Sequence, residues 1–156
     1  MNNVERVFSE SGSCAEYARG YLGYLAGLLS RVDIEAVARF AGLLEEARAG
    51  GRQVFFMGNG GSAATSSHFA NDLGKGARAA GAPPFRAISL SDNVSLITAL
   101  ANDEGYERIF VAQLESLLRE GDIVVGISAS GNSPNIVRAI EYANARGART
   151  VAVTGF

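Results

Sequence analysis

Residues 53–63, QVFFMGNGGSA, decide the fold class of this chain. Gln53 to Met57 form a short apolar run typical of a buried strand, and the glycine-rich loop GNGGS at 58–62 follows it directly. We expect a helix after this loop, from Ala63 to about Ala79. A strand, a polar loop and a helix in this order are typical of α/β proteins.

The same alternation continues along the rest of the sequence. Strands are predicted for three further apolar runs, at 85–90, 123–127 and 150–153. Helices are predicted between them, at 92–101, at 106–118 and from Pro134 until Gly147. This pattern predicts an α/β fold with a doubly wound parallel sheet. In the strand order 2-1-3-4, the loops after the first and third strands border one crevice.

Two helices are predicted before the first strand. The first covers 3–31 with a break at 11–13, and the second follows the N-cap residue Asp33 and ends at Gly50-Gly51. Their apolar residues either pack on the sheet or form an oligomer interface. We divide the chain into N-terminal helices at 1–51, which belong to the same domain and serve oligomerisation, and an α/β domain at 52–156.

Composition indicates a soluble globular domain. Of 156 residues, 47% are hydrophobic and 19% are charged, and the net charge is −2. This balance does not favour a nucleic-acid partner. No signal peptide precedes the first helix, and the uncharged stretch Gly20–Ser30 is too short to span a membrane, so we expect a cytoplasmic protein. A covering helix is missing after the last predicted strand, so we expect that a C-terminal strand and helix are absent from this chain.

Two polar loops are the candidate binding residues. The glycine loop GNGGS (58–62) follows the first strand, and the serine loop SASGNS (128–133) follows the third. Backbone N–H groups, short hydroxyl and amide donors, and two helix N-termini suit a phosphate with a polyhydroxy body. The glycine loop also fits a dinucleotide fingerprint weakly, but no acidic residue follows about 20 positions later. The serines alternatively act only as helix caps.

Three stretches resemble the SIS (sugar isomerase) domain family, and most closely its phosphoheptose isomerase branch. They are GNGGSAATSSHFANDL (58–73), LSDNVSLITALANDEGYERIF (90–110) and GISASGNSPNIVRAIEYANARG (126–147). The resemblance covers about residues 5–156. It implies a five-stranded flavodoxin-like sheet, a homotetramer built partly through the N-terminal helices, and active sites at subunit interfaces.

The resemblance also implies the residues that bind the ligand. The phosphate of a sugar phosphate would lie on the serine loop, at Ser128, Ser130, Asn132 and Ser133. The sugar would contact Asn59, Gly60 and Ser62 of the glycine loop, with Asp103 nearby. Asp103 alternatively caps a helix.

The catalytic residues depart from the family pattern. Family enzymes carry a glutamate, which is a general base and a zinc ligand, four residues after a histidine; here these positions are Asp72 and His68. The i, i+4 spacing puts both on one helical face, where they could bind zinc. The family's catalytic histidine and metal-binding glutamine lie beyond Phe156. An exposed helix carboxylate and a hydrogen-bonded histidine are the alternative interpretations.

We therefore expect an aldose–ketose isomerase. The resemblance implies interconversion of sedoheptulose 7-phosphate and D-glycero-D-manno-heptose 7-phosphate through an ene-diol, as in lipopolysaccharide heptose biosynthesis. Asp72 is the candidate base and zinc the candidate cofactor. The alternative is a non-catalytic sugar-phosphate-binding module, or a partner of the bacterial replication initiator. A sugar-sensing transcription factor and a nicotinamide enzyme fit less well.

Overall fold

The structure is a computed structural model that describes residues 2–155. The chain forms two compact units, of which the first ends at Arg39 and the second begins at Phe40. The third helix contributes to both units, whereas the sequence analysis placed it wholly in the N-terminal segment. The role of residues 1–51 stays a prediction.

The N-terminal unit is helical, as expected. Its elements are α1 (Asn3–Ser9), α2 (Cys14–Leu29) and the first residues of α3 (Ile34–Ala49). The break between α1 and α2 lies at the predicted position, and Ser13 caps α2 by accepting a hydrogen bond from the Glu16 amide. Asp33 caps α3 in the same way, because its Oδ1 accepts from the Ala36 amide at 3.0 Å.

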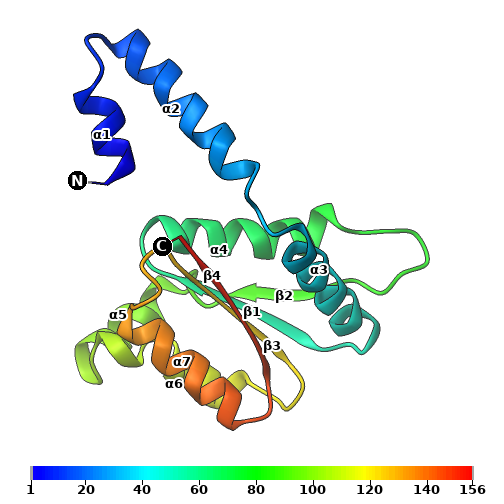
Figure 1. Cartoon of the computed structure of the whole chain (residues 1–156). Coiled ribbons are helices and arrows are strands. Elements are labelled where there is room, and N and C mark those ends of the chain that lie inside the picture. Colours follow the sequence, from blue (N-terminus) through cyan, green and yellow to red (C-terminus); the bar gives the residue numbers. More distant parts are fainter. Residues whose placement is uncertain (1, 156) are drawn as a thin grey trace. The chain divides into compact units, whose positions relative to one another are not determined.

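The second unit contains the predicted parallel sheet (Figure 1). Its strands are β1 (Gln53–Gly58), β2 (Arg86–Ser89), β3 (Ile123–Ser128) and β4 (Arg149–Thr154), in the order β2-β1-β3-β4. Gly58 at the end of β1 lies opposite Ile127 near the end of β3. The loops that follow β1 and β3 therefore leave the sheet side by side, at the point where the order in which strands are added to the sheet reverses.

Two hydrophobic layers hold the helices on the sheet. On one face, α3 and α4 (Gly61–Asn71) cover side chains such as Phe56, whose ring stacks on Phe69 at 5.3 Å. On the other face, α6 (Val111–Leu117) and α7 (Pro134–Ala145) cover Phe55 and Met57. Helix α5 (Val94–Asp103) contributes partly buried apolar residues to this second layer. The central strands β1 and β3 are buried on both sides, as their continuous apolar runs predict, whereas the edge strands β2 and β4 are partly exposed.

Two predicted helices differ in the structure. The helix after the glycine loop begins at Gly61, and it continues as a π-helix, η1 (Asp72–Gly76), that ends before the predicted residue 79. The single helix predicted at 106–118 is wrong. A 3₁₀ turn, η2 (Tyr106–Arg108), precedes α6. The Gln113 side chain donates to the Ile109 carbonyl at 2.8 Å and to the Leu90 carbonyl, which ties this break to the end of β2.

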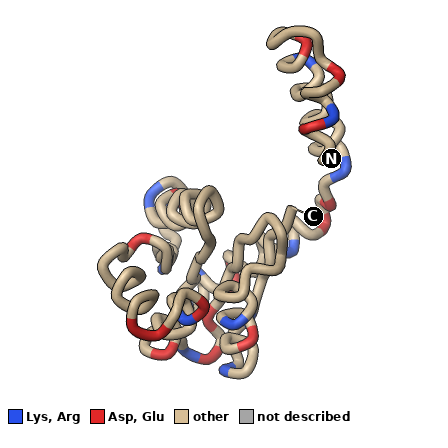
Figure 2. The backbone as a smooth tube through the Cα atoms, turned by 90° about the vertical axis from the view of Figure 1, so that its left-hand side faces the viewer, with Lys and Arg blue, Asp and Glu red and all other residues tan. Residues whose placement is uncertain are grey.

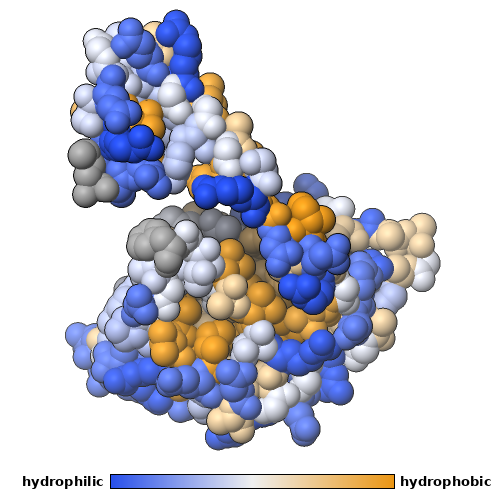
Figure 3. All heavy atoms as spheres, in the orientation of Figure 1, coloured by the Kyte–Doolittle hydropathy of each residue, from blue (hydrophilic) through white to orange (hydrophobic). Residues whose placement is uncertain are grey.

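The surface of the second unit is mixed. Figure 2 shows acidic and basic residues interspersed along the chain. Figure 3 shows apolar atoms gathered where β4 passes between α3 and α7, and Val153 on this edge strand is 41% exposed. The expected fifth strand has no counterpart among residues 2–155. Within the same residues, no helix combines the length and apolar character needed to cross a membrane.

Candidate functional site

The two polar loops line one hollow at the carboxyl ends of β1 and β3. This hollow, called the serine hollow below, has a volume of about 240 Å³. Its lining residues are Asn59, Ser62, Ile127, Ser128, Ala129, Ser130 and Ser133. The structure thus brings together five of the predicted ligand residues. Gly60, Asn132 and Asp103 are exposed and lie outside its lining.

The serine loop presents hydroxyl groups to this hollow. Ser128 is only 6% exposed, and its Oγ lies 3.2 Å from Ser133 Oγ. Ser133 stands at the N-cap position of α7, yet its side chain makes no capping hydrogen bond. Asn132 braces the loop, because its side-chain amide donates to the Ser130 carbonyl at 3.0 Å. The Ser133 hydroxyl therefore pairs with Ser128 in the loop and does not cap the helix.

A close backbone approach shapes the glycine loop. A Cβ added to Gly58 would lie 2.5 Å from the backbone carbonyl carbon of Ser62. Gly60 has φ of 53°, in the region that favours glycine. Ser91 secures the turn from the side of β2, because its Oγ accepts from the Gly58 amide at 3.2 Å and donates to the Gly58 carbonyl at 3.0 Å. This tight turn brings the N-terminus of α4 to the serine hollow.

Asn59 is held by two residues that the sequence analysis missed. Asn59 and Asn135 form a reciprocal amide pair: Asn59 Nδ2 donates to Asn135 Oδ1 at 2.9 Å, and Asn135 Nδ2 donates to Asn59 Oδ1 at 2.8 Å. The Tyr106 hydroxyl also donates to Asn59 Oδ1, at 3.0 Å. These contacts join residues that are 76 and 47 positions apart, so no local pattern could reveal them.

A second hollow adjoins the serine hollow. This tyrosine hollow has a volume of about 360 Å³, and it shares Asn59 and Ser133 with the serine hollow. Its other lining residues are Tyr106, Glu107, Pro134, Asn135 and Arg138. Together the two hollows extend from the serine loop, past Asn59, to the 3₁₀ turn η2. Such an extended site suits an elongated polar ligand.

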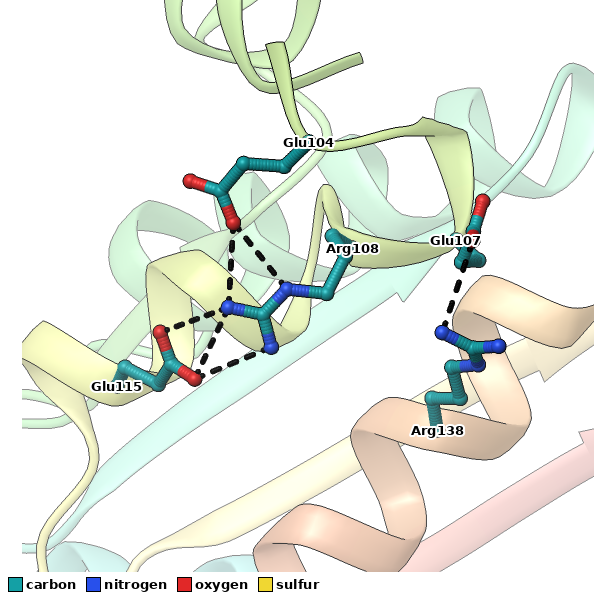
Figure 4. A network of polar contacts seen from close by, with 5 residues as sticks. All are labelled: Glu104, Glu107, Arg108, Glu115 and Arg138. Carbon is teal, nitrogen blue, oxygen red and sulfur yellow. Dashed lines mark hydrogen bonds and ion pairs between the residues drawn. The ribbon is translucent and has the colours of Figure 1, made fainter.

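Charged side chains fix η2 against its neighbours (Figure 4). Arg108 donates to Glu115 and to Glu104, each at 3.2 Å. These hydrogen bonds, chiefly the one to Glu115, raise the pKa of the Arg108 guanidinium. Glu107 forms an ion pair with Arg138 of α7 at 3.7 Å. Both contacts anchor the turn that carries Tyr106.

The predicted catalytic pair lies away from both hollows. His68 Nε2 is 3.1 Å from Asp72 Oδ2, and these side chains are 77% and 59% exposed. Asp72 follows Ser62 by ten residues, or about 15 Å along a helix. Among residues 2–155, no group of three or more possible metal ligands forms. Two ligands do not make a zinc site, so the residues described do not by themselves fit this ion.

Asp103 is the last residue of α5, and its side chain caps no helix in this structure. Its Oδ1 accepts a hydrogen bond from the neighbouring Asn102 side chain at 2.7 Å. The following turn η2 is capped by Gly105, without a side-chain hydrogen bond. Asp103 is therefore not a helix cap here, and its contact with a sugar stays a prediction.

Comparison with known proteins gives consistent matches. The family described as SIS domain matches residues 20–155. Phosphoheptose isomerase from Akkermansia muciniphila is 47% identical over 123 residues, which are 79% of this chain and 63% of that protein. Probable phosphoheptose isomerase from Thermoplasma acidophilum is 41% identical, over 88% of this chain and 75% of that protein.

A solved structure of phosphoheptose isomerase from Neisseria gonorrhoeae is similar, with a TM-score of 0.82 and 29% sequence identity. The match covers 91% of this chain and 75% of that one. The chain spans 63% and 62% of the length of the relatives from Akkermansia muciniphila and Geobacter sulfurreducens.

Proposed function

Since the chain belongs to the SIS domain family, in its phosphoheptose isomerase branch, we propose that it binds a seven-carbon sugar phosphate and isomerises it. The reaction is the interconversion of sedoheptulose 7-phosphate and D-glycero-D-manno-heptose 7-phosphate. The observation that carries this proposal is the serine hollow, in which hydroxyls from one loop face the other loop across neighbouring strand ends.

The phosphate binds at the serine loop. Ser128, Ser130 and Ser133 supply hydroxyl donors, and the N-terminus of the twelve-residue helix α7 favours negative charge. The sugar then extends past Asn59, because the tyrosine hollow continues the site in that direction. This assignment explains why the loops contain small polar residues and glycine.

Proton transfer between C1 and C2 is the chemical step. Asp72 removes a proton from C1 of the open-chain ketose and returns it to C2, while the hydroxyl proton of O1 is lost and O2 gains one by way of the ene-diol. The His68 imidazole contacts the Asp72 carboxylate and holds its orientation. Asp72 lies outside both hollows of its own chain, so this step requires the active site at a subunit interface that the family resemblance implies.

The assembly we propose is a homotetramer in the cytoplasm. Helix α2 exposes apolar residues with helical spacing, namely Tyr21, Leu22, Leu25, Leu28 and Leu29. Such a stripe needs a partner surface, and a second copy of the chain supplies one. Cys14 is exposed and free, which fits a reducing compartment.

Turnover in D₂O tests the isomerase. The chain is incubated with sedoheptulose 7-phosphate, and NMR follows the product. We expect product with deuterium at C2, because the transferred proton exchanges with solvent on the base. Product formed without deuterium, or no product from a preparation that binds the substrate, would contradict this mechanism.

A second candidate is a module that binds the sugar phosphate without turnover. The observation that favours it is the position of Asp72, which lies outside both hollows and is 59% exposed. In this case calorimetry detects binding of sedoheptulose 7-phosphate, and NMR detects neither product nor deuterium exchange. The same two measurements therefore distinguish the candidates.

A further inference from the structure

The amide pair of Asn59 and Asn135 has a defined orientation. Asn135 is 1% exposed, and its Oδ1 accepts from the backbone amide of Ile136 at 3.1 Å. The Ile136 N–H also donates to the Ser133 carbonyl. Because a backbone amide can only donate, the Asn135 oxygen faces the helix, and its Nδ2 must point to Asn59. The orientation of one amide then fixes the orientation of the other.

This orientation uses up the acceptor capacity of Asn59. Its Oδ1 has two lone pairs, and it accepts one hydrogen bond from Asn135 and one from the Tyr106 hydroxyl. One proton of Asn59 Nδ2 is bound to Asn135. Within the described part of the chain, the second proton meets no acceptor. Asn59 lines both hollows, so this proton is available to a ligand.

We propose that Asn135 is a positioning residue that makes Asn59 solely a hydrogen-bond donor toward the ligand. The site then selects an acceptor oxygen at this point, as a carbonyl, hydroxyl or phosphate group offers. The identity of the ligand as a sugar phosphate rests on the proposed function, whereas the orientation of Asn59 does not. Tyr106 contributes to the same effect, because its hydroxyl occupies the second lone pair of Asn59 Oδ1.

The surroundings keep both partners in place. Asn135 lies in the first turn of α7, beneath the serine loop, and its neighbour Ile136 belongs to the core. Tyr106 is 55% exposed, but its turn is anchored by Arg108 and by the ion pair between Glu107 and Arg138. These contacts hold the Tyr106 backbone beside Asn59.

The test begins with NMR on the ¹⁵N-labelled 156-residue chain, without any substitution. In the absence of ligand, one Asn59 side-chain proton should exchange with water slowly and the other fast. Addition of sedoheptulose 7-phosphate should shift the fast proton far more than the slow one. Equal exchange of both protons, or equal shifts, would overturn the proposal.

Variants then test the role of Asn135 by calorimetry. Asn135→Leu removes both hydrogen bonds to Asn59 without adding charge, and we expect affinity for sedoheptulose 7-phosphate to fall about tenfold. Protection of the Asn59 proton should disappear. Asn144→Leu is the matched control, because Asn144 lies on the same helix and accepts a hydrogen bond from Thr150. The affinity of this variant for sedoheptulose 7-phosphate should differ from wild type by less than about twofold.

Tyr106→Phe removes only the hydroxyl at an exposed position, so it tests the idea even if Asn135→Leu does not fold. It should leave the slow Asn59 proton protected and weaken binding less than about tenfold. Wild-type affinity in a folded Asn135→Leu variant, or loss of Asn59 protection in Tyr106→Phe, would overturn the proposal. If the wild-type chain binds no sedoheptulose 7-phosphate while the two Asn59 protons still differ, the proposed function fails, and with it the assignment of the ligand.

Discussion

The hydroxyl oxygens of Ser128 and Ser133 lie 3.2 Å apart, at the two ends of the loop between β3 and α7. Ser128 ends a buried strand, and Ser133 precedes the proline that opens the helix. The strand and the helix therefore fix both ends of the loop, and the hydroxyls are held in place before a ligand arrives. A site of this kind loses little conformational entropy when it binds an anion.

Removal of a loop hydroxyl should weaken phosphate binding. We expect Ser130→Ala and Ser133→Ala each to reduce the binding free energy of sedoheptulose 7-phosphate by about 1–3 kcal/mol, because each removes a donor to a charged oxygen. Titration calorimetry measures the effect. Ser95→Ala on α5 is the control, since Ser95 is exposed and lines neither hollow. Unchanged affinity in both loop variants would remove the ligand assignment.

Gly58 should not tolerate a side chain. In Gly58→Ala the new Cβ would meet the Ser62 backbone at 2.5 Å, and this backbone cannot move aside without opening the turn. We expect a loss of about 1–3 kcal/mol in the free energy of unfolding, measured with urea. The control is Gly42→Ala in α3, where a Cβ meets nothing within 4 Å; this change should stabilise the protein slightly. Equal stability of the two variants would contradict the argument.

Asp122 should stabilise the opposite end of the sheet. Its side chain is buried, and its two carboxylate oxygens accept from the backbone amides of Gln53 and Arg119, each at 2.9 Å. Asp122→Ala leaves two backbone donors without this partner, so unfolding should require about 2–4 kcal/mol less. Asp122→Asn keeps one acceptor and should cost less. Chemical denaturation of both variants checks the order, and a larger loss in Asp122→Asn would contradict it.

The sequence predicts the sheet well because its signals are local. The runs at 53–57 and 123–127 are apolar, short and followed by glycine-containing loops, and the structure confirms both strands, each one residue longer. The break before α6 was missed because it depends on Gln113, whose side chain reaches the carbonyl of Leu90 on another element. A contact of this range leaves no trace in a window of neighbouring residues.

The candidate site also contains residues that the sequence predicts and residues that it does not. Ser62, Ser128, Ser130 and Ser133 lie at or shortly after the carboxyl ends of β1 and β3, so topology alone places them together. Asn135 and Tyr106 lie in helical segments that resemble any capped helix in sequence. Asn135 contacts Asn59 through a reciprocal amide pair, Tyr106 contacts Asn59 through a hydroxyl hydrogen bond, and only three-dimensional packing reveals these contacts. Residues that position a ligand-binding group are harder to predict than the group itself.

The apolar stripe of α2 should determine the oligomeric state. Leu25→Glu places a charge in the middle of the stripe, so the assembly should dissociate to a smaller species in sedimentation velocity. Arg19→Gln changes the net charge equally and lies on the same helix, and it should leave the mass unchanged. Affinity for sedoheptulose 7-phosphate is measured on the same samples. Full affinity in a monomer would exclude a site shared between subunits.

Asp72 decides whether the protein is a catalyst. Asp72→Asn should leave the affinity for sedoheptulose 7-phosphate within about twofold of wild type, because this exposed side chain lies outside both hollows. Turnover, followed by NMR in D₂O, should fall by at least about 10²-fold if the carboxylate is the base. Asp72→Glu extends the carboxylate by one methylene, to the length that the family resemblance implies, and should raise kcat. Glu141→Gln on α7 is the exposed control and should change neither the affinity nor the turnover.

Turnover that persists in Asp72→Asn would assign the base to another group. Binding without turnover in wild type and in Asp72→Glu would favour the binding module.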